Sequence, residues 1–237
     1  MESEHVSREI MMERLFEALI TGDRPAARAV VDEAIEQGTP PENIVSELFW
    51  PTYEVVERLH REDKLTRMCH HLATRLLRVL VDQTSARFTQ GAHRNKTVFA
   101  VCGPTDADEL SAQIAVDLME ADGYSVCFPG GGIAIDEILE HVQERRPDLL
   151  LLFASAPCDL PEIRRLIDTI REIGACDVTQ IAVGGGVFNR ADGLAEEIGA
   201  DLWATSPMEI VELVGECPEQ RATPGQRTVG RKRKKAA

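Results

Sequence analysis

Acidic and hydroxyl side chains fall at a few positions where they could do chemistry. The run Asp106-Ala107-Asp108-Glu109 follows a short β-branched segment and opens a helical pattern. Ser111 lies at the next turn of that pattern, and Ser155 follows a second apolar segment. Carboxylates at a helix start can bind a hard cation or accept hydrogen bonds, or they can simply cap the helix and favour its dipole. The sequence shows no nucleophile paired with a general base, which favours a binding protein over an enzyme.

Histidine and tryptophan side chains form a second group of candidates in the first third of the chain. His60, His70 and His71 lie in predicted helices, where an imidazole could ligate a metal or could be exposed or hydrogen-bonded. Of the three, His71 is the metal-ligand candidate. Trp50 is followed by Pro51, which should kink its helix. Trp50 is either a ligand contact or a core residue.

Two glycine triplets, Gly130–Gly132 and Gly184–Gly186, each follow a strand pattern. Glycine there lets a ligand or a neighbouring backbone come close, or it serves a tight turn. Neither triplet fits the dinucleotide fingerprint, and the chain has no phosphate-binding loop ending in Lys-Ser/Thr, so nucleotide binding of those kinds is disfavoured. The six cysteines are scattered and read as small core residues, although Cys102 and Cys158 could be thiolate ligands.

Composition and charge limit the class of protein. The chain has 237 residues, 43% hydrophobic residues and a net charge of −14, which allows a real core and argues against nucleic-acid binding over the body of the molecule. From residue 217 onward, however, seven basic side chains stand against one acidic one. Without a membrane span or secretory signal, we expect a cytoplasmic protein that contacts nucleic acid only through this tail, if at all.

The elements that would position these residues fall into two blocks. Residues 1–90 carry apolar residues at helical spacing in four segments, which predicts a four-helix cap domain. Residues 91–96 suit a linker. Residues 97–216 then alternate apolar strands with helices five times, which predicts an α/β fold of the flavodoxin-like type with a doubly wound parallel sheet. Residues 217–237 have few apolar side chains, and we expect a disordered basic tail.

Ligands of such sheets bind beyond the carboxyl ends of the strands. The loops after Cys102, Phe128, Ala154 and Val183 are therefore where a site is expected. This edge contains the acidic run, Ser155 and both glycine triplets.

A four-helix bundle followed by a flavodoxin-like sheet resembles the cobalamin (vitamin B12)-binding domain family with an N-terminal helical cap. That family includes methionine synthase, corrinoid proteins and light-responsive cobalamin-dependent transcriptional regulators. His71-Leu72-Ala73-Thr74 is similar to the segment in which the regulators place a histidine over the upper face of the corrin. The resemblance puts Ser155 beside the buried nucleotide tail of the cofactor and Gly184 and Gly185 at its flanks.

One departure from this family concerns its lower ligand to cobalt. The family carries Asp/Glu-x-His-x-x-Gly after the first strand, and its imidazole replaces the cofactor's own base. The matching stretch here holds Asp106, but Asp108 stands in place of the histidine and Ser111 in place of the glycine. A carboxylate is a poor substitute for a neutral imidazole on low-spin cobalt, so we expect no histidine ligation from below.

Our sequence-based hypothesis is a non-enzymatic sensor or regulatory protein that holds a tetrapyrrole between its helical cap and the carboxyl ends of its strands. Cobalamin is the expected cofactor, with haem, a bilin or no cofactor as alternatives. The expected contacts are Trp50 and His71 in the cap and a set of residues in the sheet domain: Asp106, Asp108, Ser111, Ser155, Gly184 and Gly185. Two alternatives stay open, a corrinoid methyl-carrier subunit of a methyltransferase and a degenerate module without ligand that binds only proteins. A regulatory partner protein or a second copy of the chain would be the macromolecular partner.

Overall fold

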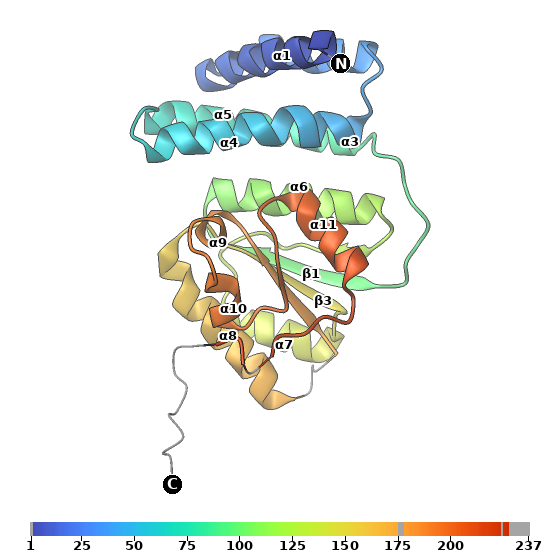
Figure 1. Ribbon diagram of the computed structural model, residues 1–237, viewed down its shortest axis with the longest axis vertical. Helices are drawn as coiled ribbons and strands as arrows, with labels where there is room; N and C mark the ends of the chain where they lie inside the picture. The colour runs from blue at the N-terminus through green and yellow to red at the C-terminus, as the bar shows by residue number, and fades with distance from the viewer. Residues whose placement is uncertain (1, 175–177, 224, 228–237) are drawn as a thin grey trace. The chain divides into compact units, whose positions relative to one another are not determined.

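The computed structural model describes residues 2–174, 178–223 and 225–227, with side chains from residue 8 onward. The chain forms two compact units, Met1–Thr89 and Gln90–Ala237. The first is all-helical and the second is an α/β unit (Figure 1). Within the described residues, no helix is both long enough and apolar enough to cross a membrane.

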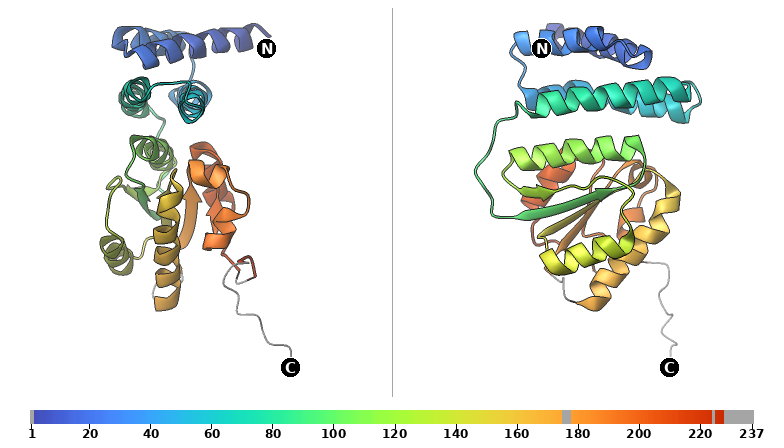
Figure 2. Two further views of the ribbon diagram at one scale, coloured as in Figure 1. Left: turned by 90° about the vertical axis from the view of Figure 1, so that its left-hand side faces the viewer. Right: turned by 180° about the vertical axis from the view of Figure 1, so that it is seen from behind.

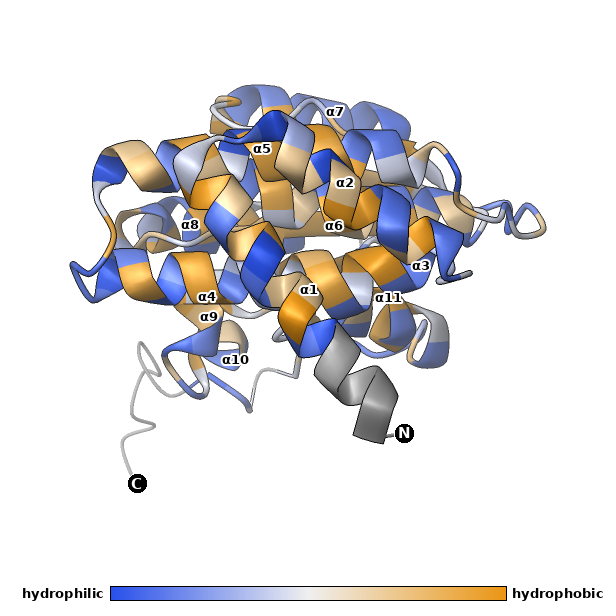
Figure 3. Cartoon of the chain, turned by 90° about the horizontal axis from the view of Figure 1, so that it is seen from above, coloured by the Kyte–Doolittle hydropathy of each residue, from blue (hydrophilic) through white to orange (hydrophobic). Residues whose placement is uncertain are grey.

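The helical unit consists of helices joined by short turns. They are α1 (Glu2–Thr21), α2 (Arg24–Glu36), α3 (Pro41–Ile44), the π-helical η1 (Val45–Phe49), α4 (Trp50–Arg61) and α5 (Arg67–Ser85). Asp23 caps α2 by accepting from the Ala26 N–H, and Thr66 caps α5 by accepting from the Cys69 N–H. The buried residues of α2, α4 and α5 are mostly apolar. Hydrophobic and hydrophilic residues alternate along the helices in Figure 3.

A π-helical segment interrupts the third predicted helix just before Pro51. Proline has no N–H, and its ring would clash with the carbonyl four residues earlier. The chain widens to a π-helix over Val45–Phe49, and the Trp50 N–H bonds to the Val45 carbonyl five residues back. Elements α3, η1 and α4 thus form a continuous helical stretch with a bulge, and the irregularity expected of Pro51 lies one turn ahead of it.

The α/β unit is built on a five-stranded parallel sheet with strand order β2-β1-β3-β4-β5. Its strands are β1 (Thr97–Cys102), β2 (Ser125–Cys127), β3 (Leu149–Phe153), β4 (Gln180–Gly184) and β5 (Leu202–Trp203). Its helices are α6 (Asp106–Ala121), α7 (Ile135–Arg145), the 3-10 turn η2 (Pro157–Asp159), α8 (Leu160–Ile173), α9 (Gly186–Asn189), α10 (Leu194–Ile198) and α11 (Pro207–Glu216). The predicted α/β class with a flavodoxin-like sheet is confirmed.

Helices cover both faces of this sheet, which is why its strands β3 and β4 are buried throughout (Figure 2). Val98 and Ala100 of β1 point to a core shared with α6 and α11. Phe99 and Val101 point to the opposite core, which α7, α8 and α10 complete. The two cores hold the strands so that their carboxyl ends meet at one edge.

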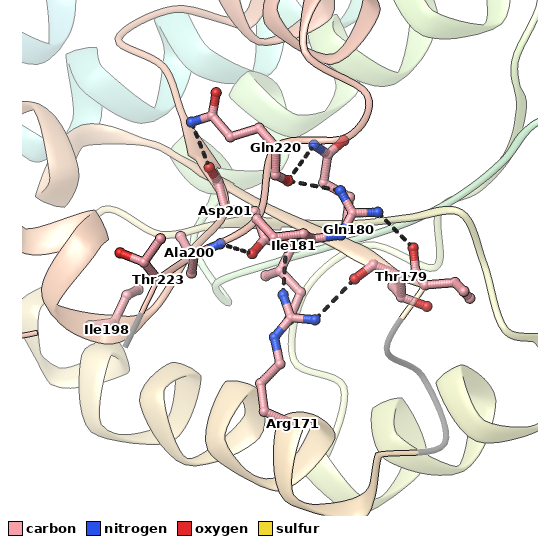
Figure 4. Close-up of polar contacts among 12 residues, drawn as sticks. Arg171, Thr179, Gln180, Ile181, Ile198, Ala200, Asp201, Gln220 and Thr223 are labelled. Atoms are coloured by element: carbon pink, nitrogen blue, oxygen red, sulfur yellow. Dashed lines mark hydrogen bonds and ion pairs between the residues drawn. The ribbon is translucent and has the colours of Figure 1, made fainter. Parts of the chain in front are cut away.

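The segment after α11 folds back against the amino end of the sheet. Gln180 Nε2 donates to the carbonyls of Cys217 and Gln220, and the Ala222 N–H donates to Asp201 (Figure 4). The disorder expected from residue 217 therefore does not hold for residues 217–223 and 225–227. The basic run at residues 231–235 lies outside the described residues.

The segment expected to be a free linker, residues 91–96, also packs onto the α/β unit. The Gly91 N–H donates to the Ala121 carbonyl, and the Arg94 side chain bonds to Asp122 at the end of α6. The predicted linker is thus hydrogen-bonded to the end of α6.

Candidate functional site

The loops at the carboxyl edge of the sheet are joined to one another by backbone contacts. Gly103, directly after β1, donates its N–H to the Phe153 carbonyl at the end of β3. Cys102 forms a bridge with Gly131 of the loop after β2. A Cβ atom on Gly131 would overlap the Gly103 carbonyl oxygen, so glycine is required for this close approach. The loops are thus tied to each other through glycine backbone.

The acidic run after β1 is helical from its first residue. Thr105 is the N-cap of α6 and accepts from the Asp108 N–H, and its hydroxyl donates to Asp108 Oδ2 at 2.5 Å. Asp106 is exposed at the first helical position. Ser111 is buried, and its hydroxyl donates to the Ala107 carbonyl at 3.1 Å. The stretch matching the lower-ligand motif is therefore the ordered first turns of a helix.

Asp108 is fully buried at this helix start. Burial raises the pKa of Asp108 above its ordinary value, the negative charge of Asp159 adds to the increase, and the hydroxyls of Ser155 and Thr105 oppose it. Asp108 Oδ1 has no hydrogen bond of ordinary geometry, although the Ser155 hydroxyl is near the carboxyl. The structure thus brings together Asp108 and Ser155, two of the residues predicted from sequence.

Ser155 lies directly after β3, and a residue missed at the sequence level packs beside it. The Arg190 guanidinium donates to the Ser155 carbonyl at 2.5 Å and occupies the space where a Cβ of Gly186 would be. Arg190 therefore brings a positive charge to the carboxyl edge. Its position four residues past the glycine triplet gave no signal in the sequence.

The paired glycines make room for the protein's own atoms. A Cβ on Gly184 would lie 2.8 Å from Cε1 of Phe153, its partner on β3, and one on Gly185 would overlap the Ala154 carbonyl. Phe153 packs in the core under α6 and α11. Phe188 is buried and Phe128 half-buried, while Phe153 fills the space at Gly184.

The candidates in the helical unit lie on separate helices. Trp50 begins α4, is half-buried and packs against Tyr53 with ring centroids 5.4 Å apart. His71 is exposed on α5, and its Nε2 accepts from Arg67 Nε at 3.3 Å. His70 is buried, bonds to Glu57 at 2.5 Å and stacks on the ring of His60 at 4.0 Å.

Metal ligation by protein side chains alone finds no support in the described residues, among which no three His, Cys, Asp or Glu side chains are placed to share an ion. The prediction that the cysteines are core residues is wrong for Cys127 and Cys158, but Cys102 and Cys217 pack against a core of the α/β unit. Cys127 and Cys158 are exposed, and Cys69, Cys102 and Cys217 are half-buried. Cys176 lies outside the described residues.

A helical unit followed by a doubly wound parallel sheet with a glycine-rich carboxyl edge defines a class of two-part α/β ligand-binding proteins. Residues 11–84 match the family model of the B12 binding domain. The chain is 26% identical to the dimethylamine corrinoid protein of Methanosarcina barkeri over 208 residues, which cover 87% of this chain and 96% of that one. It is 23% identical to a corrinoid protein of Desulfitobacterium hafniense (strain Y51), over 86% of this chain and 95% of the other.

A solved structure supports the same fold. The monomethylamine corrinoid protein of Methanosarcina barkeri superposes with a TM-score of 0.71 at 16% identity, over 88% of this chain and 98% of that one. The predicted resemblance to cobalamin-binding domains with an N-terminal helical cap is confirmed.

The residues present fit a corrinoid on one condition. Gly132, where an added Cβ would meet nothing within 4 Å, leaves the backbone open to a ligand at this edge. Asp108, however, is fully buried and bonded to Thr105, so its carboxyl offers no ligand atom to a metal at this edge. The side chains therefore fit a corrinoid that takes no lower ligand from this helix start.

Proposed function

We propose that this chain is a corrinoid-binding protein that rests its cofactor on the carboxyl edge of the α/β unit. The observation that carries the proposal is the similarity to dimethylamine corrinoid proteins, which spans 87% of this chain and 96% of the relative. Cobalamin is the cofactor that this similarity and the B12 binding domain match support. The glycine-lined loops supply backbone N–H and carbonyl groups to the macrocycle's edge.

The output of the protein is the second part of the proposal. Our sequence-based hypothesis put a sensor first, but the relatives are corrinoid proteins and give no support to transcriptional regulation. We favour the alternative, a methyl-carrier subunit that works with a methyltransferase. A corrinoid, when bound, supplies a cobalt that accepts and gives up a methyl group.

The chain's own residues then have limited tasks. Ser155, Gly184 and Gly185 remain proposed cofactor-binding residues in the α/β unit, as do Trp50 and His71 in the helical unit. Asp106, Asp108 and Ser111 belong to the start of α6, where they order the loop after β1. We propose that Asp108, which is buried and bonded to Thr105, would supply no ligand to the cofactor.

A spectral titration tests cofactor binding. Purified full-length apo-protein is mixed with hydroxocobalamin, adenosylcobalamin, haem and biliverdin, and absorbance shifts and co-elution on gel filtration are recorded. We expect a shift and co-elution with a cobalamin only. A shift with haem or biliverdin alone would identify that compound, and not cobalamin, as the ligand. A shift with none of the four would support the ligand-free module.

Matched variants locate the site. Ala156 lies in the loop after β3 at the carboxyl edge, whereas Ala92 is exposed in the segment at the opposite end of the sheet. Ala156→Trp should block the macrocycle and weaken binding, and Ala92→Trp should leave it unchanged. Equal binding by both variants would move the cofactor away from this edge.

The carrier role has its own assay. The cobalamin-loaded chain is incubated with candidate methyltransferases and a labelled methyl donor, and label on the corrinoid is measured. Transfer supports a carrier. A loaded chain that accepts no methyl group from any of them, yet changes its oligomeric state on loading or in light, would favour the sensor.

A further inference from the structure

A cavity of about 260 Å³ lies at the carboxyl ends of β1 and β3, beside α7 and α8. Most of its wall is apolar, including Ile138 of α7 and Ile163 and Leu166 of α8. It belongs to the face of the sheet opposite α6 and α11. Phe153, which packs in the other core, also contributes to its wall.

The charged residues of the cavity wall are all acidic. They are Asp159 and Glu162, and the wall contains no lysine, arginine or histidine. Asp159 Oδ2 is buried and has no hydrogen-bond partner. Asp159 Oδ1 has only the Cys158 thiol, at 3.6 Å. A buried carboxylate oxygen without a donor is costly, so this end of the cavity favours a ligand that donates hydrogen bonds.

A second buried carboxyl converges on the same place. A Cβ on Gly103, which lines the cavity, would lie 2.6 Å from Asp108 Oδ2 and 3.2 Å from Asp159 Oδ2. Asp108 is fully buried with Oδ1 unpartnered, and among the described residues neither aspartate forms an ion pair. Two carboxyls that face each other across a glycine, without a cation between them, favour binding of a positive charge.

The pKa of Asp108, raised chiefly by burial and further by the charge of Asp159, is consistent with this arrangement. A cation placed between the two groups would oppose both effects.

We infer that this cavity binds a small organic cation, with its ammonium group at Asp159 and its apolar body among Ile138, Ile163 and Leu166. An engineered cavity of about 150 Å³ holds benzene, so 260 Å³ accommodates on the order of ten non-hydrogen atoms. The cavity shares the loop after β1 and Gly132 with the edge proposed for the corrinoid, but the inference does not rest on that proposal. Its ligand class follows from two features, acidic charge at one end and an aliphatic wall at the other.

The test compares a cation with its neutral counterpart on the full-length apo-protein. Phenethylammonium and 2-phenylethanol have the same size and the same apolar body and differ in charge. We expect calorimetry to show saturable binding of phenethylammonium that is about tenfold or more tighter than that of the alcohol, because a charge-assisted hydrogen bond is lost with the ammonium. Equal affinity for the two would overturn the proposal.

Variants assign the affinity to the cavity. Asp159→Asn keeps the shape and removes the charge, and it should weaken phenethylammonium binding about tenfold. Glu172→Gln alters an exposed carboxylate at the far end of the same helix and should leave binding within about twofold. Unchanged binding by Asp159→Asn would refute the site.

Two further measurements test the apolar wall of the cavity and the chemical class of its ligand. Ile163→Phe fills the apolar body and leaves both aspartates in place, so it should abolish binding in a variant whose circular dichroism is unchanged. Survival of binding would place the amine elsewhere. Competition by millimolar Mg²⁺ that removes all phenethylammonium binding would identify an inorganic cation site and overturn the organic ligand class.

Discussion

Phe153 and Gly184 face each other as register partners on β3 and β4, and the phenyl ring occupies the space that any side chain at position 184 would need. Gly184 does not adopt a positive φ, so its requirement is one of space and not of backbone conformation. The relationship explains one glycine of the triplet without a ligand.

The first prediction concerns this pair. Gly184→Ala should destabilise the fold by about 1–3 kcal/mol, because the added methyl overpacks the core against the Phe153 ring. Urea unfolding measures the change. Phe153→Leu in the Gly184→Ala background should recover part of the loss, and a cycle without coupling between the two changes would refute the contact.

Gly215 of α11 offers the matched control. A Cβ there meets nothing within 4 Å, and the residue lies in the last turn of the helix. Gly215→Ala should therefore stabilise by up to about 1 kcal/mol. A loss similar to that of Gly184→Ala would show that both effects come from something other than overpacking.

The second prediction concerns pH. Because burial holds the pKa of Asp108 above its ordinary value of 3.8, the folded chain binds this proton more tightly than the unfolded chain. The resulting stabilisation is fully present below pH 3.8 and is lost as the pH rises through the folded-state pKa. The Asp108→Asn variant has no titrating group at this position. The free energy of unfolding of the variant should therefore fall less over this pH range than that of the parent, and at pH 7 it should be about 1 kcal/mol higher than the parent's.

Chemical denaturation at half-unit pH steps from 3 to 7 checks this slope. Asp136→Asn, an exposed carboxyl in the first turn of α7, is the control and should follow the parent profile. A parent-like slope in Asp108→Asn would mean that the carboxyl is ionised and compensated in the folded chain.

The third prediction concerns restoration of the family's lower-ligand motif. Asp108→His with Ser111→Gly places a larger ring in a fully buried position and a glycine in a helix interior. We expect destabilisation of about 2–4 kcal/mol and no imidazole ligation. Electron paramagnetic resonance of the Co(II) form with ¹⁵N-histidine-labelled protein measures ligation. Coupling to a labelled nitrogen would show that the first turn of α6 unwinds to receive the cofactor.

The fourth prediction concerns the contact network at the amino end of the sheet. The Asp201 side chain is 1% exposed, pairs with Arg171 at 2.5 Å and accepts from the Ile181 and Ala222 N–H groups (Figure 4). Asp201→Ala leaves Arg171 and two N–H donors unsatisfied and should cost about 3–5 kcal/mol.

The exposed pair between Arg94 and Asp122 provides the comparison, since both side chains are more than a third exposed. Asp122→Ala should cost about 1 kcal/mol or less. Similar losses in the two variants, measured by urea unfolding, would show that burial of Asp201 does not set its contribution.

Periodicity was sufficient to predict most of the fold. Val98 to Val101 alternate between two cores, and an apolar run of that kind predicts a strand covered on both faces. The hydrogen-bonded structure of residues 217–223 was not predictable from periodicity. Gln180, Gln220 and Asp201 hold that segment through polar contacts across 19 to 40 residues of sequence, and such contacts leave no periodic signal.

The candidate site was predictable in position but less so in chemistry. The strand ends located the edge, and Ser155 and Asp108 do meet there. Thr105 was missed, although Thr105-x-x-Asp108 has the spacing of a helix cap. Asp159 was missed because its proximity to Asp108 depends on the β1–β3 pairing and not on sequence distance.

Cobalt content after loading tests the central claim most directly. The full-length chain is incubated with excess hydroxocobalamin, separated by gel filtration and analysed for cobalt per mole of protein. The account predicts one cobalt per chain for the parent and for Ala92→Trp, and substantially less for Ala156→Trp. Protein that elutes without cobalt under saturating cobalamin would contradict it.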